Sequence, residues 1–492
     1  MTETAKKKRG MPSSFTILLA LLAIVAVITV IVSGTSGGAV TAARLSDFCT
    51  APIKGFADAL PVCLFVMILG GFLGMMTETG ALDNGIAVLV QKLKGNEIML
   101  IPVLMLIFSL GGTTYGMCEE TVPFYALLAA TMMAAGFDPM VGAATVLLGA
   151  GCGCLGSTVN PFAVGAAVDA LTGVDIAVNQ SIIIGLGAVL WIVTTAMSIF
   201  FVMNYAKKVK ADKGSTILSM QELKDAEEAH GKAASEVHKE VKLTGRQKGV
   251  LIAFAFTFVV MIVGFIPLAD LNEGVANFFD AGAVYDADGN AVVQGWSALI
   301  TGLPIGQWYF DEASTWFFLM AVLIGIIGGL SEKQIVNTFI TGAADMMSVV
   351  LVIALARGIS VLMANTGLDV YVLDAAANAL AGLSGVIFAP MSFLVYFGLS
   401  FLIPSTSGMA TVSMPIMGPL AVKLGFSPEV MVMIFSAAIG VVNLFTPTSG
   451  AIMGGLALAK IEWTTWLKFA LKLIVALSVV CAVILTVACV LL

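Results

Sequence analysis

Two polar stretches interrupt an otherwise apolar sequence: Gly-Gly-Thr-Thr-Tyr-Gly-Met-Cys-Glu-Glu at 111–120 and Gly-Ser-Thr-Val-Asn-Pro at 156–161. A backbone that stops being helical inside a bilayer must find hydrogen-bond partners within the protein, because lipid supplies none. Such interruptions are tolerated where they line a cavity, and in transporters they mark the binding site. The two stretches therefore predict broken helices that meet at a site within the membrane.

Matching stretches return later in the chain, as Pro-Ser-Thr-Ser-Gly-Met at 404–409 and Thr-Pro-Thr-Ser-Gly at 446–450. The first pair of stretches aligns at an offset of 292 and the second at 289, and glycines further upstream align at 287. A near-constant offset over roughly 110 residues predicts an internal duplication. The alternative is that these small residues only allow helices to pack closely.

The composition indicates an all-α protein that crosses the membrane many times. Of the 492 residues, 59% are hydrophobic and 11% are charged, whereas a soluble domain carries about 25% charged residues. Apolar runs of the length needed to span a bilayer recur along the chain. Seven scattered cysteines and two histidines in one charged segment favour reduced core thiols over a disulfide framework or a metal site. No nucleophile, cofactor or nucleic-acid motif is expected, so an enzyme is not predicted.

The first membrane repeat is expected over residues 12–205, after a basic cytoplasmic tail at 1–11. Residues 98–110 are only 13 in number, and at about 1.5 Å each they cover about 20 Å, short of a hydrocarbon core of about 30 Å. We therefore expect a re-entrant hairpin over 98–135, with the first polar stretch at its tip. A crossing helix over 140–175, broken at the second stretch, should follow.

Two hydrophilic segments are expected to separate the repeats. Residues 206–248 contain ten Lys and Arg residues, which predicts a cytoplasmic linker by the positive-inside rule. An extra helix over 249–268 should cross outward to an external loop over 269–312, which has seven acids and no Lys or Arg. The extra crossing would invert the second repeat relative to the first.

The second repeat is expected over 313–492, with a hairpin over 387–424 and a broken helix over 428–459. Its hairpin would enter from the outer side, opposite to the first. Of the 24 Lys and Arg residues, 20 then fall on inner segments or inner helix ends, which agrees with a cytoplasmic N-terminus. Two opposed hairpins and two broken helices predict a secondary transporter.

The candidate substrate-binding residues lie at the four interruptions, where side-chain hydroxyls and free backbone groups coincide. Half-helix N-termini favour a carboxylate, and exposed carbonyls favour Na⁺. The alternative for each hydroxyl is a bond to a carbonyl of its own helix. The candidates are Thr113, Thr114, Gly116, Ser157, Thr158, Asn160, Ser405, Thr406, Ser407, Thr446, Thr448 and Ser449. A Na⁺ site is considered near Ser157, Asn160, Asn443 and Thr446.

Three charged side chains are expected within the membrane: Glu119, Glu120 and Arg357. Ionisable groups are costly there and are functional hypotheses by default. The acids could accept a proton, coordinate Na⁺ or pair with a cationic substrate, or one of them could cap the returning helix. Arg357 could hold a substrate carboxylate or neutralise either glutamate. Asp58 and Asp345 match between the repeats and are expected to cap interfacial helices.

Several of these motifs resemble the YfcC-like branch of the anaerobic C4-dicarboxylate carrier family, part of the wider ion transporter superfamily. The motifs are Gly-Asn-Glu-Ile at 95–98, Gly-Gly-Thr-Thr-Tyr-Gly-Met-Cys-Glu-Glu-Thr-Val-Pro-Phe at 111–124, Leu-Gly-Ser-Thr-Val-Asn-Pro-Phe at 155–162, Ala-Arg-Gly-Ile at 356–359 and Pro-Thr-Ser-Gly at 447–450. The resemblance implies a homodimer in the cytoplasmic membrane, with a scaffold domain and a transport domain that moves as an elevator. It also implies coupling to Na⁺ or H⁺, or exchange.

Similar proteins include arginine/ornithine exchangers as well as dicarboxylate carriers, so the resemblance leaves the substrate open. The Ser-Asn-Thr signature of related dicarboxylate carriers is only approximated at 157–160 and at 446–449. We therefore expect a transporter of a small carboxylate-bearing solute, with an amino acid such as arginine or ornithine preferred. A C4-dicarboxylate or another short organic acid is the alternative, and a channel is a further one.

Overall fold

A computed structural model describes residues 14–82, 84–85, 88, 96–236, 242–266, 268–271, 273–286, 291–403 and 405–492. Within these ranges the protein is built of helices, with one small antiparallel ribbon, β1 (Val284–Tyr285) and β2 (Ala291–Val293), in the predicted external loop. Eight of the described helices are long and apolar enough to cross a membrane. Several residues used above lie outside the described ranges: the basic tail, Lys92, Lys94, His238, Asp288 and Pro404.

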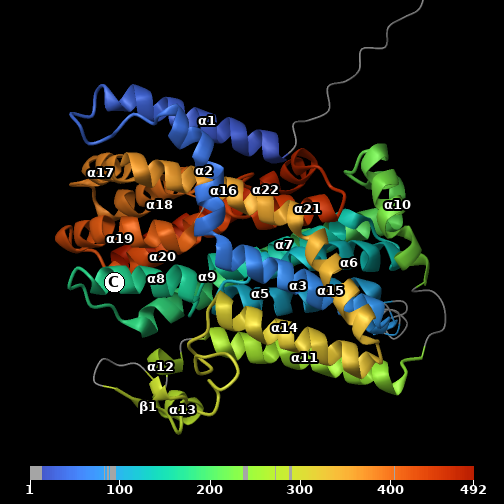
Figure 1. Cartoon of the computed structure of the whole chain (residues 1–492). Coiled ribbons are helices and arrows are strands. Elements are labelled where there is room, and N and C mark those ends of the chain that lie inside the picture. The colour runs from blue at the N-terminus through green and yellow to red at the C-terminus, as the bar shows by residue number, and fades with distance from the viewer. Residues whose placement is uncertain are drawn as a thin grey trace, which may run out of the picture.

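The chain forms two helical halves joined by a middle segment (Figure 1). The first half contains α1 (Ser14–Ser33), α2 (Leu45–Asp58), α3 (Leu60–Glu78), α5 (Leu100–Tyr115), α6 (Val122–Ala134), α7 (Pro139–Leu155), α8 (Ala166–Thr172) and α9 (Gln180–Ala211). The middle segment contains α10 (Met220–Glu236), α11 (Gly245–Phe265), α12 (Leu268–Leu271) and α13 (Glu273–Phe279). The second half contains α14 (Phe310–Gly328), α15 (Glu332–Asp345), α16 (Met347–Thr366), α17 (Leu368–Leu380), α18 (Gly385–Leu402), α19 (Thr406–Lys423), α20 (Pro428–Val442), α21 (Gly450–Leu458) and α22 (Trp463–Leu491).

The first polar stretch is more helical than predicted. Helix α5 continues to Tyr115 and ends at Gly116, which has a left-handed φ of 81°, a conformation that glycine adopts at helix C-termini. With the preceding turn it spans 19 residues, more than the 13 on which the expectation of a re-entrant segment rested. The hydroxyl of Thr114 bonds the carbonyl of Leu110 at 2.7 Å, so it satisfies itself within the helix rather than breaking it.

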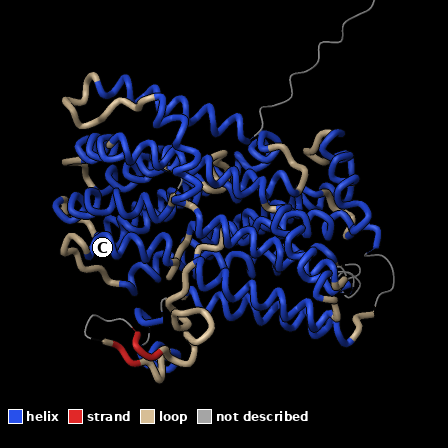
Figure 2. Tube along the Cα trace, in the orientation of Figure 1, coloured by secondary structure: helices blue, strands red, loops and turns tan. Residues whose placement is uncertain are grey.

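The other interruptions also differ from the sequence expectation at their edges. Helix α19 begins at Thr406, with Ser405 as its N-cap, so most of the expected tip at 404–409 is helical. The last break is longer than expected, because α20 already ends at Val442 and α21 begins at Gly450. Figure 2 shows loop segments in the middle of the helical body as well as at its ends. The polar residues thus marked the places of the breaks but not their exact limits.

Each crossing helix next to a break is covered by both arms of a helical pair. Helices α5 and α6 both pack on α7, and α18 and α19 both pack on α20. Phe108 of α5 meets Phe124 of α6 with ring centroids 5.5 Å apart, and the Tyr396 hydroxyl of α18 donates to Ser413 of α19 at 3.2 Å. In Figure 1, the α5–α6 pair lies on one side of the molecule and the α18–α19 pair on the other.

Glycines allow close contact between the two halves at reciprocal places. A Cβ atom at Gly55 in α2 would overlap the backbone of Gly358 in α16. A Cβ atom at Gly342 in α15 would likewise overlap the backbone of Gly70 in α3. Each short helix therefore packs on a long helix of the other half at near-backbone distance, as small residues permit in membrane proteins.

The middle segment is more structured than a solvated linker. Helix α10 packs against α6. Its Glu222 accepts a hydrogen bond from the backbone of Glu462 at 2.9 Å, and its His230 shares one with the carbonyl of Leu458 at 3.0 Å. Both residues are buried. Helix α10 therefore has a face that packs on α6 and forms hydrogen bonds with Leu458 and Glu462 of the second half. The charged sequence of this segment did not indicate that face.

Candidate substrate site

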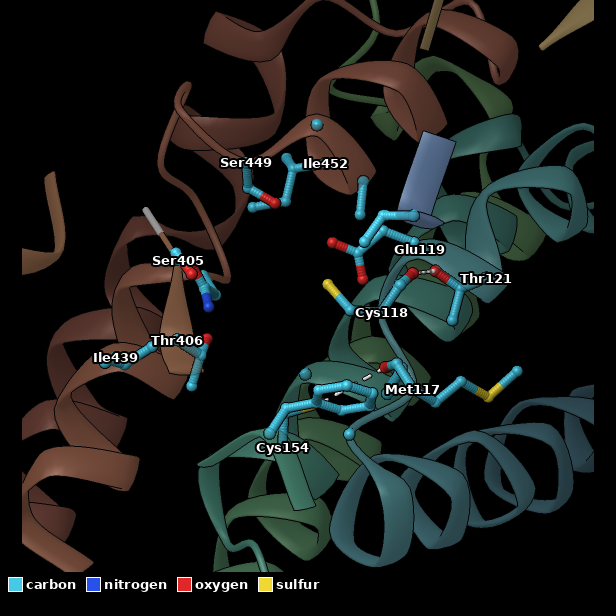
Figure 3. Close-up of a pocket in the computed structure, with 18 of the residues that line it drawn as sticks. Met117, Cys118, Glu119, Thr121, Cys154, Ser405, Thr406, Ile439, Ser449 and Ile452 are labelled. Atoms are coloured by element: carbon cyan, nitrogen blue, oxygen red, sulfur yellow. Dashed lines mark hydrogen bonds between the residues drawn. The ribbon is translucent and has the colours of Figure 1, made fainter. Parts of the chain in front are cut away.

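One cavity lies where the interruptions of the two halves meet. It is lined from one side by the turn after α5 and the helical turn at Glu119–Thr121, and from the other by the start of α19 and the break after α20. In Figure 3, Glu119 and Cys118 face Ser405, Thr406 and Ser449 across an open space. The predicted residues that line the cavity are Gly116, Glu119, Glu120, Asn160, Arg357, Ser405, Thr406, Ser407, Asn443, Thr448 and Ser449.

Five predicted residues do not line this cavity: Thr113, Thr114, Ser157, Thr158 and Thr446. The Thr113 hydroxyl donates to the carbonyl of Gly156 at 2.6 Å, and both the backbone and the hydroxyl of Thr158 donate to the carbonyl of Thr113, at 2.9 and 3.0 Å. These bonds join the end of α5 to the break after α7. The polar atoms of Thr113 and Thr158 thus satisfy the backbone at the end of α5 and at the break after α7. These side chains hold the two segments together and are not placed to contact a molecule bound in the cavity.

Asn160 lines the cavity but its amide is already engaged. Its Oδ1 accepts from the backbone of Phe162 at 2.9 Å and of Ala163 at 3.3 Å. Its Nδ2 donates to the Ser157 hydroxyl at 2.9 Å, which itself donates to the carbonyl of Cys154 at 2.6 Å. Both lone pairs of the amide oxygen are therefore in use, so this half of the considered Na⁺ site has no free side-chain oxygen at Asn160.

The two glutamates have different surroundings. Glu120 is 2% exposed, and its Oε2 accepts from the backbone N–H of Cys118 at 2.9 Å, so it caps the turn that leads into α6. Glu119 is half-buried, and its carboxylate points into the cavity (Figure 3). The capping role considered for either acid thus falls to Glu120, and Glu119 is the acid that a ligand can reach.

Arg357 pairs with neither glutamate but with Asp58, the last residue of α2. Its Nε lies 3.3 Å from Oδ2 of Asp58, and the side chains are 26% and 51% exposed. Arg357 also lines the cavity, and its Nη1 lies 3.8 Å from where a Cβ atom would stand on Gly408 in the first turn of α19. The expectation that Asp58 only caps a helix missed this ion pair, whose partners are 299 positions apart in the sequence.

Five cavity residues with polar side chains were missed by sequence reasoning: Cys118, Thr121, Tyr125, Cys154 and Ser436. Ser436, Ile439, Gly440 and Asn443 form the cavity face of α20, and at the offset of 289 they match Leu147, Ala150, Gly151 and Cys154 of α7. The sequence contained a signal for Ser436 and Cys154, because Asn443 was already a candidate: Ser436 lies two helical turns before it on the same face, at i−7, and Cys154 is its match in the repeat alignment.

Interrupted helices around a cavity lined by both polar and apolar side chains, within a largely helical body whose described part has eight potential membrane spans, fit the architecture of a multi-pass membrane transporter. The comparison with protein families agrees. The chain belongs to the C4-dicarboxylate anaerobic carrier family, whose model matches residues 38–490. The resemblance inferred from the motifs is confirmed.

Individual relatives give the family context. An uncharacterised protein of Haemophilus influenzae is 28% identical over 90% of this chain and 78% of its own length. A protein of Escherichia coli named as the putative basic amino acid antiporter YfcC is 27% identical over 87% of this chain and 77% of its own length.

Two solved transporter structures align over nearly the whole chain at low sequence identity. MtrF of Neisseria gonorrhoeae, described among antimetabolite efflux pumps, has a TM-score of 0.46, 17% identity and coverage of 98% of this chain and 96% of its own. The YdaH transporter of Alcanivorax borkumensis has a TM-score of 0.47, 15% identity and coverage of 96% and 97%.

Proposed function

We propose that this protein is a secondary active transporter of an amino acid with a cationic side chain, such as arginine or ornithine. The observation that carries the proposal is the charge of the cavity. Among its described lining residues, Glu119 and Glu120 are acidic and Arg357 is the one basic residue. Because Arg357 is paired with Asp58 and Glu120 caps a turn, the Glu119 carboxylate is left to bind a cation.

The other wall suits the carboxylate of an amino acid. The first N–H groups of a helix have no partner within it, and the helix dipole favours an anion there. Helix α19 begins at the cavity with Ser405, Thr406 and Ser407, and the Arg357 guanidinium lies beside its first turn. A zwitterion with a distal cation could thus place its two ends on opposite walls.

A C4-dicarboxylate is the second candidate, and the family description favours it. Arg357 and the α19 N-terminus could bind one carboxylate, but the second carboxylate would lie near Glu119, where like-charge repulsion would weaken binding. The printed name of the Escherichia coli relative, a putative basic amino acid antiporter, supports the amino acid instead.

The architecture supports two inverted repeats, over 12–205 and 313–492, with α5–α6 and α18–α19 as opposed re-entrant hairpins. Support comes from the near-constant sequence offset and from the reciprocal contacts of α2 with α16 and of α15 with α3. We further infer an elevator-type homodimer in the cytoplasmic membrane with a cytoplasmic N-terminus. Its coupling ion would be Na⁺ or H⁺, or it would exchange substrates.

Uptake into proteoliposomes tests the proposal. L-arginine, L-ornithine, succinate and fumarate would be offered with imposed Na⁺ or H⁺ gradients, or with unlabelled substrate inside. We expect uptake of a cationic amino acid by exchange or under a gradient. Uptake of succinate alone would replace the proposed substrate, whereas conductance above carrier rates would indicate a channel. No driven uptake of any solute would refute the proposal.

A further inference from the structure

The face of α20 that lines the cavity carries a buried hydroxyl without a partner. Ser436 is 2% exposed, and its Oγ has no hydrogen-bond partner among the described residues. Some helical serines of this protein bond the carbonyl four residues earlier, as Ser400 does with Tyr396 at 2.7 Å. Buried polar groups are nearly always satisfied, so an orphan at a cavity calls for a partner that the protein itself does not supply.

Comparison of the two halves shows that this hydroxyl is specific to one wall. At the 289 offset, Ser436 and Asn443 of α20 stand where α7 has Leu147 and Cys154, and all four residues line the cavity. The opposite asymmetry holds at the hairpin tips, where Glu119 and Glu120 match Thr411 and Val412 at the 292 offset. The cavity therefore has an acidic wall from the first half and, from the second half, a wall of hydrogen-bonding groups whose charged residue is the cation Arg357.

The wall from the second half also includes the start of α19. Ile439, one helical turn after Ser436, lies beside Thr406 and Ser405 in Figure 3, across the open space from Glu119. The Ser405 hydroxyl accepts a hydrogen bond from the N–H of Gly408 at 3.1 Å. The N–H groups of Thr406 and Ser407 lie in the first turn of α19 and have no carbonyl four residues earlier within the helix. Donors from α19 and α20 thus converge on one wall.

We propose that Ser436 is a specificity residue whose hydroxyl donates a hydrogen bond to the carboxylate of the transported amino acid. The inference rests on the proposed function and adds the orientation of the substrate. The carboxylate lies against α19 and α20, and the cationic side chain lies toward Glu119. Leu147, at the matching place on α7, offers no polar atom, so a substrate turned end for end would leave its carboxylate without this hydrogen bond.

The test compares L-arginine with agmatine, which is arginine without its carboxylate, on purified wild-type and Ser436→Ala protein. We expect the variant to bind L-arginine about tenfold more weakly, the effect of losing one hydrogen bond to a charged group, and to bind agmatine as the wild type does. Ser436→Cys, a weaker donor of similar size, should fall between. An equal loss for both ligands, or no loss for L-arginine, would overturn the inference.

Two controls separate a ligand contact from a structural role. Ser392 in α18 is also a buried serine without a partner but does not line the cavity, so Ser392→Ala should bind both ligands like the wild type. The ligand-free melting temperature of Ser436→Ala should be unchanged or higher, because the variant loses an unsatisfied polar group. A lower one would indicate a structural role. A wild type that binds neither ligand would refute the proposed function and this inference together.

Discussion

The polar residues of this protein divide into those that hold the interrupted backbone and those that face the cavity. Thr113, Ser157 and Asn160 spend their hydrogen bonds within the first half. Glu119 reaches the open space, and Ser436 has no partner among the described residues. The residue type does not tell the two groups apart, because a hydroxyl in a membrane helix can bond the backbone or face a cavity.

Glu119→Gln should weaken binding of a cationic amino acid selectively. A charge-assisted hydrogen bond contributes about 1.5–3 kcal/mol, so the dissociation constant for L-arginine should rise at least about tenfold. Calorimetry on purified protein would measure it, with the exposed Glu332 of α15 changed to Gln as the control. Unaltered affinity in Glu119→Gln would show that the cation binds elsewhere.

Asp58→Asn should shift the substrate preference toward anions. Removing the acid frees the guanidinium of Arg357 beside the cavity, while the exposed ion pair itself contributes only about 0–1 kcal/mol to stability. We expect the ratio of succinate to L-arginine affinity to rise about fivefold, with little change in melting temperature. Asp345→Asn, the matched exposed acid in the other half, is the control and should leave the ratio as it is. The same shift in both variants would point to a general charge effect.

At the level of elements, sequence reasoning located the four breaks but misplaced their ends. Glycine and proline mark where a helix can stop, yet α5 runs through two glycines to Gly116, because the Thr114 hydroxyl bonds a carbonyl within the helix and the Thr113 hydroxyl bonds the carbonyl of Gly156. Whether a polar residue ends a helix depends on the partners that neighbouring helices offer. Helix α10 was missed for the same reason, since its buried side is defined by the helices beneath it.

The contact between α2 and α16 should be intolerant of any side chain larger than hydrogen at Gly55. Overpacking a dense interface costs about 1–3 kcal/mol or more, and a valine at Gly55 would meet backbone that cannot rotate away. The melting temperature of Gly55→Val in detergent should fall by at least several degrees. Gly185→Ala, in α9 with nothing within 4 Å of a new Cβ atom, should not fall. A stable Gly55→Val protein would show that the two halves are packed less closely than described.

At the scale of the whole molecule, the two halves meet around one cavity with their interrupted helices. In the proposed inverted repeats, the arms of each hairpin would reach the cavity from a different side of the membrane, which would give access to one site from both sides. Because the two halves line the cavity with different side chains, the substrate need not be symmetric.

The opposed orientation of the hairpins predicts where their bases are accessible. Asn96 precedes the first hairpin and Ser384 the second, and both are exposed. Cysteines introduced at these positions, with the exposed Cys49 changed to Ser, would be treated with a membrane-impermeant maleimide. Ser384→Cys should react in intact cells and Asn96→Cys only after permeabilisation. Labelling of both in intact cells would contradict the inverted repeats.

The sequence by itself determined the helical membrane class, most of the potential membrane spans, the places of the breaks and the family, because hydrophobic length and repeated motifs are local properties of the sequence. Only the tertiary structure decided that Arg357 meets Asp58, that Glu119 reaches into the cavity while Glu120 caps a turn, and that Ser436 has no hydrogen-bond partner in the described part of the chain. Those facts depend on which helices pack together and on which polar groups that packing leaves unsatisfied, and no single segment of the chain contains that information.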